Sequence, residues 1–349
     1  MHIESAQSIC LGRVPSVFFD RPTFSNVSEL IFDKDLYSLL RLCGVDEQLI
    51  GEGASDYDRF NAYCNAIPVL YGHPIVIKIV SLLKSCFDID LPCSAQNCNE
   101  IWRIVADKLI DTPMIGWDLI NLINPTSINC VLIDRDQFVK IDAFPKGIEP
   151  VLCGQTLVQT NASDWSEWEK EMSDVIEQCI LKGSHAVYFK LSDELLSDIP
   201  SLYHVEQSLC TPKKRLENIG VLLTQALRYL CLKCRQKGLF LYTEIQTDDL
   251  KRVVLLLERI YNSVGLPSML FFSRELKTMD AMIEFSARLP MGLLRGGFMT
   301  SYYPSERELS YAFEATIARY PSGALTVLYG DDLRYTAFEK ARFEKMVIN

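Results

Sequence analysis

Histidine is scarce in this chain, and the sequence signals of several common functions are missing. Only four histidines occur among 349 residues, at His2, His73, His185 and His204, and none lies in an HxH or HExxH motif. A metal centre built from imidazole ligands is therefore not expected. A P-loop, a glycine-rich phosphate loop and a nucleophile elbow are also missing, which argues against phosphate-loop and serine-hydrolase chemistry.

Net positive charge and long apolar runs are lacking as well. The chain has 35 basic and 45 acidic residues, a net charge of −10, so nothing in it favours nucleic acid or an anionic membrane surface. A small anionic ligand remains compatible with local groups of Arg and Lys. The most hydrophobic stretch, Ile75–Leu83, is interrupted by Lys78 and is far shorter than a membrane span. The start, MHIESAQSICLGR, lacks a signal-peptide pattern, and we expect a cytoplasmic protein.

Cysteine is abundant but not arranged as a framework. The twelve cysteines are scattered, and in a reducing compartment such residues are usually small core residues. Cys231 and Cys234 form the one CxxC pair, inside a helical pattern, and Cys93 and Cys98 are too loosely spaced to complete a zinc site convincingly. We therefore expect free thiols and no zinc.

Short β-rich apolar runs alternate with helical patterns along the chain. Continuous apolar runs are typical of parallel strands that are covered on both faces. Eight strand–helix units predict a (β/α)8 TIM barrel, and an open doubly wound sheet is the competing fold. The predicted strands are Pro15–Phe19, Asn129–Ile133, Glu149–Cys153, His185–Leu191, Gly238–Ile245, Ser268–Ser273, Gly292–Met299 and Ala324–Gly330.

A long helical stretch separates the first two predicted strands. It is too long for one crossover, so we predict a helical insertion over 26–124 and a barrel made of 1–25 and 125–349. Caps support the barrel helices: Asp248 or Asp249 begins one helix, Ser305 begins another, and Gly238 ends a third. The predicted helices of the insertion are Val27–Cys43, Asp56–Ala66, Pro74–Cys86 and Asn97–Asn124.

The carboxyl ends of the predicted strands carry mostly charged side chains. A barrel has its active site at that end, so the predicted pocket is polar and suits a hydroxyl-rich ligand. Each strand-end acid is also, taken singly, typical of a helix N-cap or a solvated loop. The carboxylates of Asp20, Glu244 and Asp331 are the set that would hold Mg²⁺ or Mn²⁺, although we expect no metal. The strand-end residues are Asp20, Arg21, Asp134, Arg135, Asp136, Gln155, Lys190, Glu244, Ser273, Arg274, Glu275, Ser301, Tyr302, Tyr303, Asp331 and Asp332, with Arg334 just beyond.

One segment resembles a known family. GVDEQLIGEGASDYDRFNAYCNAIPVLYGHP, Gly44–Pro74, is similar to the helical insertion of the uronate (glucuronate) isomerases of the amidohydrolase superfamily. LLKSCFDI and NEIWRIVADKL extend the resemblance, and weaker matches continue to TVLYGDDLRY near the end. The resemblance implies a TIM barrel and the aldose–ketose isomerisation of hexuronates in carbohydrate metabolism.

The chain departs from the family where the family's chemistry lies. The HxH pair after strand one is replaced by VFFDRPTF, and a histidine pair in the insertion by Ile77 and Val80. The strand-five histidine falls on Glu244, and the Arg-Pro-Asp after strand three is absent from VLCGQTLVQ. The family's strand-eight aspartate corresponds to Asp331 or Asp332, and Arg334 is a displaced candidate for its arginine. A Ser-Asp-His of strand four is replaced by Val187, Tyr188 and Phe189.

Three hypotheses follow from the altered site. The first is a catalytically degenerate homologue that still binds a sugar acid, alone or as a homo-oligomer. The second is an enzyme in which Lys190 forms a Schiff base or acts as a base. The third is an active isomerase with a rearranged carboxylate site. The catalytic candidates are Asp331, Asp332, Glu244 and Lys190, and the candidates for binding substrate are Arg334, Arg21, Arg274 and Asp134.

Overall fold

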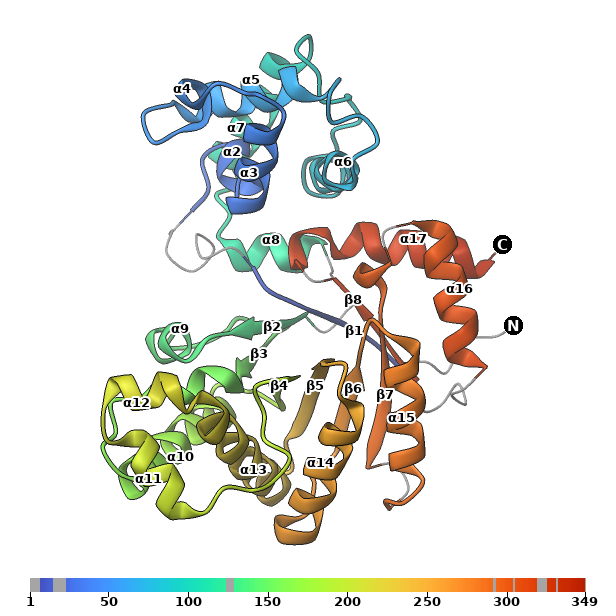
Figure 1. The fold of residues 1–349 in the computed structure, drawn as a ribbon. Coiled ribbons are helices and arrows are strands. Elements are labelled where there is room, and N and C mark those ends of the chain that lie inside the picture. Colours follow the sequence, from blue (N-terminus) through green and yellow to red (C-terminus); the bar gives the residue numbers. More distant parts are fainter. Residues whose placement is uncertain are drawn as a thin grey trace. The chain divides into compact units, whose positions relative to one another are not determined.

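A computed structural model describes residues 7–14, 23–123, 129–290, 293–303, 305–318, 325–330 and 332–348. Eight parallel strands close into a barrel in sequential order, which confirms the (β/α)8 prediction and excludes the open sheet (Figure 1). None of the helices in these ranges combines the length and apolar content that crossing a bilayer requires. The strands are β1 (Gln7–Gly12), β2 (Asn129–Ile133), β3 (Ile148–Cys153), β4 (Ala186–Ser192), β5 (Phe240–Gln246), β6 (Met269–Phe272), β7 (Leu294–Met299) and β8 (Leu325–Tyr329).

The prediction for the first strand was wrong. Gln7–Gly12 pairs with β8, with Ile9 opposite Leu328, whereas the predicted strand Pro15–Phe19 lies outside the described residues. Gln7–Gly12 begins with the polar residues Gln7 and Ser8 and has no strong local strand signal, so its pairing with β8 is visible only in the structure. Because β1 ends at Gly12, Asp20 and Arg21 do not directly follow the first strand.

Contacts divide the chain into two compact units. The barrel unit comprises Met1–Gly12 and Cys130–Tyr329, and the helical unit comprises Arg13–Asn129 and Gly330–Asn349. The expected domain division at 26–124 stays a prediction, since compactness alone does not define a domain. The helices of the barrel unit, which lie outside its strands, are α9 (Arg135–Lys140), η1 (Gly154–Val158), α10 (Trp165–Leu181), α11 (Leu202–Leu209), α12 (Pro212–Glu217), α13 (Ile219–Lys237), α14 (Leu250–Val264), α15 (Leu276–Ser286), η2 (Thr300–Tyr302) and α16 (Glu306–Ile317).

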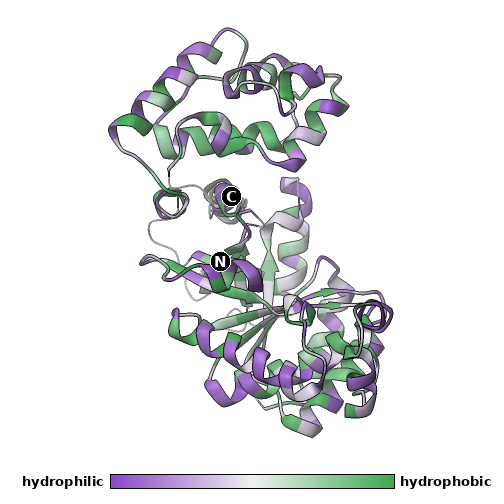
Figure 2. Cartoon of the chain, turned by 90° about the vertical axis from the view of Figure 1, so that its left-hand side faces the viewer, coloured by the Kyte–Doolittle hydropathy of each residue, from purple (hydrophilic) through white to green (hydrophobic). Residues whose placement is uncertain are grey.

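The helical unit includes the C-terminal end of the chain. Its last helix packs against α6 (Pro74–Phe87), and the 3-10 turn before that helix contacts α6 and α8 (Gly116–Ile123). Hydrophilic and hydrophobic residues alternate along the helices of both units, as expected for helices with one buried face (Figure 2). The helices of this unit are α2 (Val27–Ile31), α3 (Lys34–Leu42), α4 (Glu47–Ile50), α5 (Asp56–Ala66), α6 (Pro74–Phe87), α7 (Cys98–Asp111), α8 (Gly116–Ile123), η4 (Leu333–Tyr335) and α17 (Thr336–Ile348).

Two predicted long helices are each divided into two. The predicted helix Val27–Cys43 breaks at Asp33, whose side chain caps α3 by accepting from the backbone N–H groups of Asp35 and Leu36. The predicted helix Asn97–Asn124 breaks after α7, because Pro113 cannot donate a backbone hydrogen bond and disfavours helix at the residue before it.

The predicted caps are confirmed. Asp249 caps α14 by accepting from the backbone N–H of Arg252. Ser305 and Glu308 form a reciprocal capping box at the start of α16. Gly238 ends α13 in the left-handed conformation, with φ +70°, which glycine adopts without strain.

Candidate functional site

Strand alternation determines which side chains reach the barrel mouth. Ala186 and Tyr188 of β4 and Tyr242 of β5 belong to the apolar cluster that fills the barrel interior. Successive side chains on a strand point to opposite faces, so Lys190 and Glu244 share the inward face with these residues, one step nearer the carboxyl end. The two residues are register partners on neighbouring strands. The barrel therefore brings together two of the four predicted catalytic residues.

The carboxylate of Glu244 is held by three donors from three strands or their ends. The phenol of Tyr188 donates to Oε2, and the phenol of Tyr302 donates to Oε1 at 2.6 Å. The side-chain amide of Gln246 also donates to Oε1. A carboxylate with both oxygens bonded in this way has a defined orientation. Glu244 is only partly buried, so it remains open to a ligand.

Sequence reasoning assigned no role to the three donors. Tyr302 was noted at the end of strand seven, Tyr188 only as a substitute for a family histidine, and Gln246 not at all. Gln246 lies two residues after Glu244 and thus on the same face of β5, so strand alternation is a signal that identifies it. No local pattern links Tyr188 and Tyr302 to Glu244, because they are 56 and 58 residues away from it.

A pocket of about 390 Å³ opens beside this carboxylate, at the carboxyl ends of β5 and β6. Arg274 lines the pocket with an exposed side chain, and its backbone oxygen accepts a hydrogen bond from the phenol of Tyr303 at 3.3 Å. Burial raises the pKa of Tyr303, and the nearby Arg274 partly opposes that rise. Arg274 thus supplies positive charge to a pocket whose other charged lining residues are Asp193, Glu244, Asp248 and Glu275.

Two of these acids share one cation from a residue outside the pocket lining. The ammonium group of Lys277 lies 3.1 Å from Asp248 and 2.9 Å from Glu275. Hydrogen bonds to both carboxylates raise the pKa of Lys277, which keeps it charged. Lys277 therefore offsets one unit of the negative charge of the pocket wall, and Arg274 supplies the positive charge that an anionic ligand would pair with.

Lys190 is half-buried at the mouth of the barrel. Its backbone oxygen accepts a hydrogen bond from the side chain of Gln155 at 2.8 Å. Within the part of the chain that the structure describes, its Nζ amino group has no hydrogen bond and no ion pair. Lys190 is not itself a lining residue of the pocket, but it is the register partner of Glu244, which is one.

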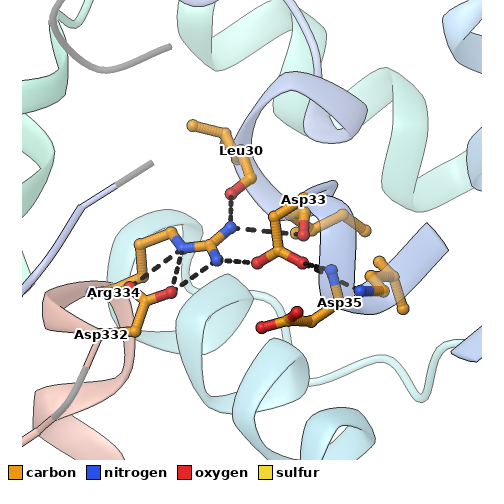
Figure 3. Close-up of polar contacts among 7 residues, drawn as sticks. Leu30, Asp33, Asp35, Asp332 and Arg334 are labelled. Carbon is orange, nitrogen blue, oxygen red and sulfur yellow. Dashed lines mark hydrogen bonds and ion pairs between the residues drawn. The ribbon is translucent and has the colours of Figure 1, made fainter. Parts of the chain in front are cut away.

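Asp332 and Arg334 belong to the helical unit, where they act together. Arg334 is 1% exposed. Its Nε and Nη2 donate to Asp332, Nη2 also donates to Asp33, and Nη1 donates to the backbone oxygens of Leu30 and Ile31 at 2.9 and 3.3 Å (Figure 3). All five N–H groups are thus engaged by protein acceptors. Through these hydrogen bonds, Arg334 links the junction between α2 and α3 to the segment that follows β8.

The remaining candidates are less informative. Asp134 is half-buried and begins α9 at the end of β2. Arg21, Asp20 and Asp331 lie outside the described residues.

The described residues do not match a metal centre. In the described ranges, no three His, Cys, Asp or Glu side chains gather as a metal-binding group. Glu244, the described member of the magnesium set, has both oxygens engaged by hydrogen-bond donors. Three histidines fall in the described ranges: His73 caps α6, His204 lies in α11, and His185 precedes β4 at the end opposite the mouth. No imidazole contributes to the Glu244 site in this part of the chain.

Comparisons with known proteins agree on one family. The glucuronate isomerase family model matches residues 13–185. A uronate isomerase of Brachyspira hyodysenteriae is 32% identical over 97 residues, 27% of this chain and 21% of that protein. One of Clostridium acetobutylicum is 22% identical over 212 residues, 54% of this chain and 44% of that protein. The chain is a divergent member of the uronate isomerase family.

Solved structures of uronate isomerases share the fold. The crystal structure of the Thermotoga maritima uronate isomerase has a TM-score of 0.73 at 13% identity and covers 99% of this chain and 87% of that one. The Caulobacter crescentus glucuronate isomerase also has a TM-score of 0.73, at 12% identity, with 99% and 85% covered. The matched sequence spans less than half the length of the curated uronate isomerases above, whereas the fold extends over nearly all of this chain.

Proposed function

We propose that this uronate isomerase-like barrel binds a small sugar acid in the Glu244 pocket and has lost the isomerase chemistry of its family. The observation that carries the proposal is the set of groups around Glu244: two phenols and a carboxamide surround the residue that stands where the family has its strand-five histidine. Moving a proton between adjacent carbons of an open-chain sugar requires a base and a group that stabilises the enediolate. Most of the groups that the resemblance assigns to those roles are replaced.

The pocket retains what recognition of a sugar acid needs. The exposed guanidinium of Arg274 matches a carboxylate in charge and geometry. Carboxylates such as Glu244 and Asp193 are acceptors for sugar hydroxyl groups. A ligand of this kind has an acid group at one end and several hydroxyls along its length.

Calorimetric titration with D-glucuronate, D-gluconate and neutral D-glucose tests the binding. We expect the two acids to bind and glucose to bind much more weakly, because Arg274 has no anion to pair with. Arg274→Gln should abolish the preference for acids. Arg288→Gln is the matched control, since Arg288 pairs with Glu258 on α14 and does not line the pocket. Equal affinity for glucose and the acids contradicts the proposal.

Turnover is tested separately, with NMR observation of glucuronate and galacturonate incubated with pure protein. The expected result is no ketose product. Product formation that Glu244→Gln and Asp331→Asn both abolish would show that isomerase activity persists.

A further inference from the structure

We propose that Lys190 forms a reversible imine with a carbonyl-bearing ligand in the barrel mouth, which makes the site a covalent receptor for aldehydes or ketones. The inference rests on the proposed function, because the ligand that reaches Lys190 is taken to enter the Glu244 pocket. It adds a chemical requirement to that function: the ligand carries a carbonyl group as well as an acid group.

The position of Lys190 supports this role. It lies on the inward face of β4, two residues beyond the buried Tyr188 and in register with Glu244 on β5. Its side chain is half-buried, so a ligand that reaches it leaves bulk water. Its amino group makes no hydrogen bond or ion pair with any residue that the structure describes. Nucleophilic lysines differ in this respect from the many lysines that are held in ion pairs.

The groups beside Lys190 suit the proton transfers of imine formation. The Glu244 carboxylate and the phenols of Tyr188 and Tyr302 form one hydrogen-bonded set. A carboxylate accepts a proton and a phenol donates one, so the set holds both an acceptor and donors. Arg274 at the end of β6 adds the positive charge that anchors an acid group elsewhere on the ligand.

The reaction is balanced without a further reactant. Lys190 gives one proton from its ammonium group to the Glu244 carboxylate, and the nitrogen lone pair forms a bond to the carbonyl carbon. A second proton moves from the nitrogen to the carbonyl oxygen, which becomes a hydroxyl group. The resulting carbinolamine loses its hydroxyl group, with one proton, as water, and the carbon–nitrogen double bond remains. Water reverses both steps, so the ligand is released unchanged.

Borohydride trapping followed by peptide mass spectrometry tests the proposal on the full chain. D-glucuronate has an aldehyde in its open form, whereas D-gluconate has the acid and hydroxyl groups but no aldehyde. We expect reduction in the presence of glucuronate to add the mass of the ligand less one oxygen atom at Lys190. Gluconate should protect Lys190 from this labelling but leave no adduct of its own.

Variants distinguish a site from general glycation. Lys190→Arg keeps the charge and removes the nucleophile, so the adduct should disappear while gluconate still binds. Lys213→Gln is the control: Lys213 is 85% exposed on α12, so removing it should leave the adduct at Lys190 unchanged. An adduct spread evenly over surface lysines overturns the proposal.

Binding data separate this inference from the function on which it rests. If gluconate and glucuronate both bind without an adduct at Lys190, the imine is disproved and the sugar-acid site stands. If neither acid binds and no adduct forms, both fail. An adduct at Lys190 that gluconate does not suppress would support the nucleophile and refute a shared pocket.

Discussion

Arg334 and Asp33 form an ion pair between side chains that are 301 residues apart in the chain and lie in the same helical unit. The same guanidinium also donates to the carboxylate of Asp332 (Figure 3). Burial alone would lower the pKa of Arg334, but Asp332, Tyr335 and Asp33 raise it above its ordinary value. The guanidinium is therefore charged under all conditions in which the protein folds.

Replacing Arg334 should destabilise the helical unit strongly. Arg334→Leu leaves two carboxylates without their cation, and we expect a loss of about 3 kcal/mol in the free energy of unfolding. Arg334→Lys should recover only part of this, because an ammonium group cannot reproduce the planar fork. Urea denaturation followed by circular dichroism measures both. Arg41→Ala, which breaks the exposed Arg41–Glu47 pair, should leave the midpoint nearly unchanged, and an equal effect of the two changes would contradict the role of Arg334.

The capping box of α16 predicts a pH-dependent effect. Hydrogen bonds with Ser305 lower the pKa of Glu308 in the folded state, so their contribution to stability is present above the unfolded pKa and is lost as the pH falls through the folded pKa. Ser305→Ala should lower the free energy of unfolding at pH 7 and should lower it less at pH 3. Thermal unfolding at the two pH values tests this, with Ser310→Ala in the same helix as the control. A cost that grows toward low pH would contradict the prediction.

The phenol of Tyr302 should matter for ligand binding rather than for folding. Tyr302→Phe removes one of the donors that orient Glu244, and we expect about fivefold weaker binding of gluconate, the equivalent of one hydrogen bond of about 1 kcal/mol. Tyr311→Phe makes the same chemical change at a side chain that is 70% exposed. This control variant should bind gluconate as tightly as the unaltered protein. If Tyr302→Phe binds normally, Glu244 does not contact the ligand.

The thiols should differ sharply in reactivity. Burial raises the pKa of Cys231 to about 12 and that of Cys179 to about 12, so both remain protonated and shielded at pH 8. Cys210 is exposed and should react with iodoacetamide in the native protein. Mass spectrometry before and after urea unfolding counts the modified residues. Rapid labelling of Cys231 without denaturant would mean that α13 opens locally.

Local sequence signals predicted much of the barrel. The strand predicted at Asn129–Ile133 is β2 with the same bounds, and the helix predicted at Asp56–Ala66 is α5 with the same bounds. Such runs are bounded by their own caps and turns, so neighbouring residues suffice to place them. The resemblance of Gly44–Pro74 to a family is likewise a property of contiguous residues, and the comparisons confirm the family.

The site was predicted only in part, because its members are distant in the chain. Glu244 and Lys190 were found by reading strand ends, since a barrel gathers those ends at one mouth. The sequence analysis did not assign Tyr188 and Gln246 to the Glu244 site. The residues around Arg334 in the sequence do not show whether this arginine binds a ligand or is buried among protein acceptors. Counting its acceptors requires knowing that α2 and the segment after β8 are in contact.

The sequence by itself determined the number of strand–helix units, the caps of α13, α14 and α16, and the replacement of the family's histidines, because each of these depends on residues close together in the chain. Only the tertiary structure decided that Gln7–Gly12 is the strand beside β8, that Tyr188 and Tyr302 meet at Glu244, and that Arg334 is buried between Asp33 and Asp332. These outcomes depend on which distant segments pair, and pairing is selected by the packing of the whole chain rather than by any one stretch of it.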